Sequence, residues 1–161
     1  MTDQRHKTGG MARLMYVVAI GFGSGLLPRA PGTAGSVVGV IIAWPLMGLS
    51  LPVYLAATVA VSGLGIYAAG VAERQLGKKD PGAVVIDEIA GILVTFTLVT
   101  PTPAHLILGF CLFRLFDISK PPPCRWAEGR FSGGFGIMAD DLMAGVYAAL
   151  VLQAAIRFGG I

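Results

Sequence analysis

Residues 30–72 read APGTAGSVVGVIIAWPLMGLSLPVYLAATVAVSGLGIYAAGVA, a run of 43 residues without Asp, Glu, Lys or Arg. A helix needs about 20 apolar residues to cross the hydrocarbon core of a membrane. The run is therefore long enough for two crossings. It predicts membrane helices over 35–50 and 53–72, joined by a tight turn at Ser50-Leu51-Pro52.

Three further runs, 89–113, 14–28 and 142–156, are also free of charged residues. Hydrophobic residues make up 55% of the chain and charged residues 13%, about half the roughly 25% of ordinary soluble domains. This composition excludes a disordered chain or a nucleic-acid-binding tail, because both need many more charges. A soluble protein with buried helices stays open, since several runs are short, but an integral membrane protein is favoured.

Basic residues predict which helix ends face the cytoplasm, because Lys and Arg bias loops to that side. The net charge of +3 suits an anionic lipid surface better than a nucleic acid. The basic clusters are Arg5, Lys7 and Arg13; Lys78 and Lys79; and Arg114, Lys120, Arg125 and Arg130. All three lie inside only if residues 86–116 cross twice and turn at Pro101-Thr102-Pro103. A single long helix through these prolines is the alternative.

The predicted fold class is all-α: a multi-pass membrane bundle of four to five membrane helices that forms one domain over residues 1–161. The last membrane helix is expected over 140–157. Residues 12–27, which contain several glycines, predict a short helix lying at the interface. Residues 1–12 are expected to be a flexible tail.

Two helix starts carry polar residues that are typical of helix N-termini. Thr33 or Ser36 can cap the helix that begins near Gly35. Asp140 and Asp141 are expected at the start of the last helix, where the helix dipole favours carboxylates.

Five carboxylates stand in apolar surroundings, where they are costly unless paired, solvated or bound to a metal. On the predicted topology all five reach the cytoplasmic side, together with the Gly-rich stretch 32–36, Arg114 and Lys120. Carboxylate oxygens suit Mg²⁺, and Arg or Lys can hold a phosphate. The set predicts a metal–phosphate site built on Asp87, Glu88, Asp117, Asp140 and Asp141.

Structural readings of the same residues stay open at this point. The pairs Asp87-Glu88 and Asp140-Asp141 could each serve only to compensate a helix dipole. Arg114 and Asp117, three residues apart, could simply neutralise each other. Purely structural roles for all three acidic sites at once are disfavoured, because each is costly by itself.

Four stretches, in order, resemble the phosphatidylglycerophosphatase A family. They are GFGSGLLPRAPGTAGSVVG at 21–39, DPGAVVIDEIAG at 80–91, FRLFDISKPPP at 113–123 and GGFGIMADDLMAG at 133–145. Together they cover most of the chain, so the resemblance is more specific than any single motif.

The resemblance implies an enzyme of the bacterial inner membrane that removes the terminal phosphate of phosphatidylglycerophosphate, with Mg²⁺, on the cytoplasmic side. Phosphatidylglycerol is the lipid product. The implied partners are this phospholipid and the membrane, with no nucleic acid. The motifs that carry the resemblance contain all five carboxylates, and Arg114, Lys120, Thr33 and Ser36 stand in the same motifs.

The roles expected of these residues follow their chemistry. Asp117, Asp140 and Asp141 are the first choices as Mg²⁺ ligands, and Asp87 or Glu88 is a further ligand or a general base. Arg114 and Lys120 are expected to hold the phosphate, and Thr33 and Ser36 to assist at the cofactor-binding helix start. Hydrolysis by a water that the metal activates is favoured, and an aspartyl-phosphate intermediate stays open.

Two other functions compete with the enzyme. A small transporter or ion-conducting bundle would use its carboxylates to bind a cation near the middle of the membrane. The predicted clustering at one membrane face argues against it. A non-catalytic membrane scaffold is disfavoured because it leaves five costly carboxylates without a purpose.

Overall fold

The computed structural model describes residues 9–122 and 131–160. Within these ranges all regular secondary structure is helical, which confirms the predicted all-α class. The helices are α1 (Gly10–Ala19), the 3₁₀ helix η1 (Gly21–Leu26), α2 (Pro31–Leu46), α3 (Leu51–Leu76), α4 (Ile86–Thr95), α5 (Pro103–Ser119) and α7 (Gly133–Gly159). Two basic residues used in the topology prediction, Arg125 and Arg130, lie outside the described residues. So do residues 1–8 of the predicted tail.

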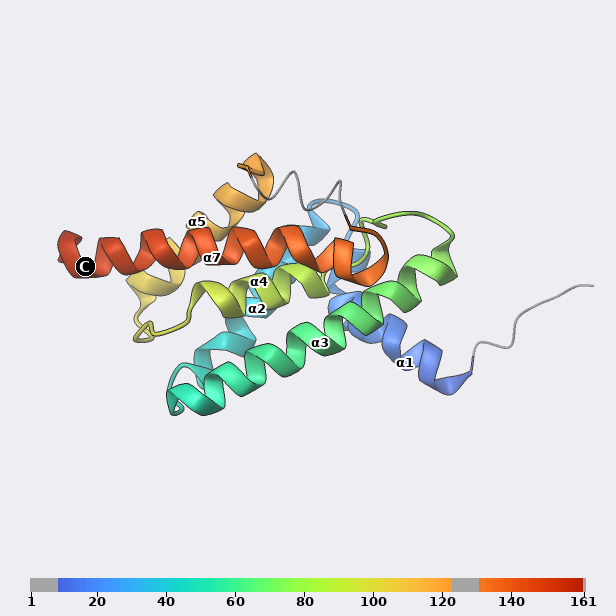
Figure 1. Ribbon diagram of the computed structural model, residues 1–161, viewed down its shortest axis with the longest axis horizontal. Coiled ribbons are helices and arrows are strands. Elements are labelled where there is room, and N and C mark those ends of the chain that lie inside the picture. Colours follow the sequence, from blue (N-terminus) through green and yellow to red (C-terminus); the bar gives the residue numbers. More distant parts are fainter. Residues whose placement is uncertain (1–8, 123–130, 161) are drawn as a thin grey trace, which may run out of the picture.

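The short helix α4 is the centre of the molecule (Figure 1). It contacts α2, α3, α5 and α7, and eight of its ten residues are buried. Its first half packs with α1 and α3 through Ile86 and Ile89. Its second half packs with α5 and α7 through Ile92 and Leu93. The other helices therefore enclose α4, and the carboxylates at its start are held inside the bundle.

Glycines bring α7 close to its neighbours. A side chain on Gly145 would place its Cβ 2.5 Å from the carbonyl oxygen of Gly91 in α4. A side chain on Gly134 would overlap the carbonyl oxygen of Ile66 in α3. Since real Cβ atoms do not come this close to backbone atoms, these crossings need glycine. They set how deeply α7 is inserted between α3 and α4.

Residues 86–116 fold as two helices, as the double-crossing prediction requires, and the single long helix is wrong. Helix α5 begins at Pro103, where the Thr102 side chain accepts a hydrogen bond from the His105 N–H at 3.1 Å. Helix α4, however, ends at Thr95, so its ten residues extend only about 15 Å.

The predicted starts of the first two α-helices are wrong. Helix α1 begins at Gly10, inside the segment expected to be a tail, and the helix expected over 12–27 breaks at Gly21–Gly23, where φ is positive. Helix α2 begins at Pro31, because Ala30 is left-handed and proline suits the first helical turn. Thr33 and Ser36 therefore lie inside α2 and do not cap it.

The last helix begins at Gly133 rather than near residue 140. Asp140 and Asp141 are consequently two turns inside α7, so compensation of the helix dipole does not explain them. The glycines at its start are helical because they pack on α3, as at Gly134.

Two of the described helices are long and apolar enough to cross a membrane by length and composition: Leu51–Leu76 and Gly133–Gly159. Gly10–Ala19 and Pro31–Leu46 are apolar but shorter. Only two of the described helices meet this criterion, so the predicted bundle of four to five membrane helices is not confirmed.

Candidate active site

The alternating direction of the helices gathers the polar residues at one end of the bundle. The starts of α2, α4 and α7 meet the end of α5 there, because α3 and α5 run opposite to their neighbours (Figure 1). A cavity of about 150 Å³ lies among them, which we call the acidic cavity. It is lined by all five predicted carboxylates and Lys120, with Asp80, Gly82, Val84 and Ile137.

Asp87, Glu88 and Asp141 form the tightest acidic group in the acidic cavity. Each offers one carboxylate oxygen, and these oxygens all lie within 4.8 Å of one another. Asp87 and Glu88 come from the first turn of α4 and Asp141 from α7. The contact of Gly91 with Gly145 allows the two helices to approach closely enough for this arrangement.

All three members of this acidic group are carboxylates, so none of them offsets the negative charge of the others. Burial, and after it the charge of Glu88, raises the pKa of Asp87 well above its ordinary value. Burial also raises the pKa of Glu88. The Oε2 atom of Glu88 is buried and has no hydrogen-bond partner within the described part of the chain. Leaving a buried carboxylate oxygen unpaired is costly, so this group is a candidate for binding a cation.

The two other carboxylates are paired with cations. The Lys120 ammonium donates to Asp140 Oδ2 at 2.8 Å. The Arg114 guanidinium donates to Asp117 Oδ2 at 2.5 Å. Asp140 is buried and the other three residues are half-buried, so the pairs place positive charge next to the acidic group.

The start of α2 lies against these residues. Ser36 is completely buried; its hydroxyl donates to the Gly32 carbonyl at 2.8 Å and accepts from Arg114 Nη1 at 3.4 Å. A Cβ on Gly32 would overlap Glu88 Oε1. Thr33 follows in the first turn of α2 and is half-buried. The backbone of α2 therefore touches the site at Gly32, as expected for the Gly-rich stretch.

The grouping of the carboxylates differs from the one expected from sequence. Asp141 joins Asp87 and Glu88, whereas Asp117 and Asp140 are held by cations. The roles of the individual residues stay predictions. Asp80, which was not among the predicted site residues, also lines the acidic cavity. Its position in the stretch 80–91, which carries the resemblance, was the signal that could have identified it.

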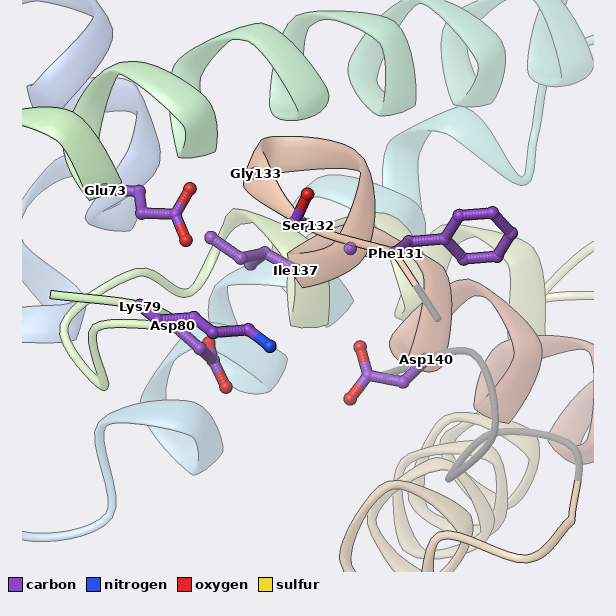
Figure 2. Close-up of a pocket in the computed structure, with 9 residues that line it drawn as sticks. Glu73, Lys79, Asp80, Phe131, Ser132, Gly133, Ile137 and Asp140 are labelled. Carbon is purple, nitrogen blue, oxygen red and sulfur yellow. The ribbon is translucent and has the colours of Figure 1, made fainter. Parts of the chain in front are cut away.

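A second cavity of about 270 Å³ adjoins the acidic cavity, and we call it the antechamber (Figure 2). The two share Asp80, Ile137 and Asp140. Lys79 and Asp140 point into the antechamber from opposite sides, and Glu73 and Ser132 line it further out (Figure 2). Charged and apolar side chains both line the antechamber, and it shares part of its wall with the acidic cavity.

Comparison with known proteins agrees with this chemistry. The family model described as Phosphatidylglycerophosphatase A matches residues 17–156. A protein of Haemophilus influenzae with that name is 38% identical over 142 residues, covering 87% of each chain. One of Escherichia coli with the same name is 38% identical over 156 residues, covering 92% of this chain and 90% of the relative.

A third relative carries a different name. A Bacteroides thetaiotaomicron protein, provisionally named a phosphatidylinositol-3-phosphatase, is 38% identical over 151 residues, covering 88% of this chain and 93% of the relative. No solved structure matches the chain. With the family model and two curated relatives in agreement over most of its length, the chain belongs to the phosphatidylglycerophosphatase A family.

Proposed function

We propose that this chain hydrolyses the terminal phosphomonoester of phosphatidylglycerophosphate, releasing phosphatidylglycerol and inorganic phosphate. The names of the two phosphatidylglycerophosphatase A relatives support the substrate. The observation that carries the proposal is the buried group Asp87, Glu88 and Asp141, set beside Arg114 and Lys120. Such a site can hold a cation and a phosphate together.

The donor set fits Mg²⁺. Three carboxylates offer hard oxygen ligands, which this ion prefers, and the unpartnered Oε2 of Glu88 is a place for positive charge. We assign Asp87, Glu88 and Asp141 as the residues that would hold it. When bound there, Mg²⁺ supplies charge that offsets the negative charge developing on the phosphoryl oxygens and promotes attack by water.

The chain's own cations orient the phosphate. Arg114 presents a planar fork and Lys120 a point charge, and both can exchange a carboxylate partner for phosphate oxygens. Asp117 and Asp140 hold these cations in place before substrate arrives, so little reorganisation is needed when it binds. Ser36 supports Arg114 from the side of α2.

We further propose that the protein sits in the inner membrane with this site facing the cytoplasm. Helices α3 and α7 would cross it, with α2 and α5, each about 25 Å long, packed beside them. Large apolar side chains face outward on these helices, with Ile41, Val59, Ile107 and Leu150 each more than 60% exposed. Arg74, Lys78 and Lys79 lie at the site's end of the bundle, which the positive-inside rule places in the cytoplasm.

The test is phosphate release by the purified protein in detergent. Phosphatidylglycerophosphate and phosphatidylinositol 3-phosphate are offered separately, with Mg²⁺ or with chelator, to the wild type and to Asp87→Asn and Asp141→Asn. Release from the first lipid that needs Mg²⁺ and is lost in both variants is expected. Preference for the second lipid would reassign the substrate. Absence of release by folded wild type would refute the enzyme and favour a cation-binding transporter.

A further inference from the structure

An apolar groove of about 230 Å³ runs between α2 and α5, outside the acidic cavity and the antechamber. Its walls contain no polar surface. From α2 it takes Val37, Val40 and Ile41, and from α5 Leu106, Ile107 and Phe110. Val37, Ile41 and Ile107 are exposed at its rim, whereas the other three are half-buried at its floor.

The groove starts beside the phosphate-binding side of the site. Ser36 directly precedes Val37, and Arg114 lies one helical turn beyond Phe110. These two residues meet across the same pair of helices, with Arg114 Nη1 3.4 Å from Ser36 Oγ. Arg114 in turn binds Asp117, which lines the acidic cavity. Polar contacts therefore connect the head of the groove to the site.

Together with the proposed function, on which the inference rests, this continuity points to one occupant. We infer that the groove between α2 and α5 receives an acyl chain of the lipid substrate while Arg114 and Lys120 hold its phosphate. The lipid substrate has a doubly charged phosphate at one end and hydrocarbon at the other. This surface likewise has Arg114 at one end and apolar side chains along the groove. The groove would thus select lipid phosphates that enter sideways from the membrane.

The antechamber is separate from the groove. It is built by α3, α7 and the segment containing Lys79 and Asp80, and it shares no residue with the groove. The lipid product can return to the membrane between α2 and α5.

The groove affects the orientation of the bound lipid more than the affinity of the protein for it. Membrane hydrocarbon is as apolar as the groove, so moving a chain between them gains little hydrophobic free energy. Packing in the groove instead fixes the direction in which the phosphate points. Filling the groove should therefore lower kcat/KM for the lipid by at least about fivefold, the kind of loss that follows from misplacing a reacting group.

The experiment compares two substrates that share a headgroup. Ile107→Trp and Ile41→Trp would fill the rim, and Val59→Trp on α3 is the matched control because Val59 is similarly exposed. Each protein is assayed in detergent with long-chain phosphatidylglycerophosphate and with its fully deacylated, water-soluble headgroup. We expect both groove variants to lose activity on the long-chain lipid but not on the deacylated headgroup. Val59→Trp should match wild type on both substrates.

Equal losses on the two substrates, or no loss on the lipid, would overturn the inference. A photoreactive acyl-chain analogue of the substrate gives a second readout that needs no variant. It should label residues 37–41 and 106–110 of wild type, and unlabelled phosphatidylglycerophosphate, but not phosphatidylcholine, should compete. Labelling that both lipids reduce equally would also overturn it. A wild type that hydrolyses neither substrate refutes the proposed function instead.

Discussion

Replacing Gly32 by alanine tests the proposed site without removing any of its functional groups. The added methyl group would overlap Glu88 Oε1 and lie 3.2 Å from Arg114 Nη1. Ordinary carbon contacts begin near 3.5 Å, so the Glu88 carboxylate must move by roughly 1 Å. A carboxylate at the end of a flexible side chain can do this at small cost in folding free energy. A displacement of that size at a reacting centre, however, can cost about 100-fold in rate.

We therefore expect Gly32→Ala to reduce kcat for phosphatidylglycerophosphate about 100-fold while the midpoint of thermal unfolding stays within a few degrees of wild type. Gly63→Ala is the matched control, because Gly63 is also helical and nothing lies within 4 Å of its added Cβ. Its activity should equal that of wild type. Activity of Gly32→Ala within about twofold of wild type would show that the position of Glu88 does not matter, which would refute the assigned site.

Three other predictions concern the cation, the phosphate and the helix packing. Mg²⁺ at 100 times its Kd should stabilise wild type by about 2.7 kcal/mol, which is measured as a rise in the midpoint of thermal unfolding. Asp87→Asn should abolish this rise. If the rise persists in the variant, Asp87 is not a ligand of the ion. Lys120→Gln should raise KM for the lipid phosphate about tenfold in steady-state assays, and Lys120→Arg should recover part of this loss. An unchanged KM in Lys120→Gln would show that Lys120 does not bind the phosphate. Gly134→Ala, whose Cβ would overlap the Ile66 carbonyl, should destabilise the fold by about 2 kcal/mol, measured by thermal unfolding against Gly63→Ala; equal stability would contradict the close crossing of α3 and α7.

The sequence was sufficient to place the helices where charge patterning was strong. The long uncharged run predicted α2 and α3, and Pro101 and Pro103 predicted the break before α5. The limits of α4 and α7 could not be predicted in the same way. The glycines at 133–136 disfavour a helix in isolation, but contact with α3 makes them helical. Local preference was overridden by packing between distant segments.

The candidate site was predictable as a set, and its internal arrangement was not. Carboxylates in apolar surroundings are costly wherever they lie, so their convergence followed from the topology. Which of them face one another depends on how far α7 is rotated and inserted against α4. That is set at Gly91 and Gly145, and no spacing in the sequence reports it. Asp141 therefore joins Asp87 and Glu88, although Asp140 stands beside it in the chain.

The position of α4 has a consequence for how the protein is made. A ten-residue helix with two carboxylates in its first turn is too short and too polar to enter a membrane by itself. Neighbouring helices must shield it, and α7, with which it has the most extensive contact, is synthesised after the other described helices. Because α7 also brings Asp141, the acidic group is incomplete until α7 has been synthesised. The nascent protein thus completes this acidic group only when α7 has packed on α4.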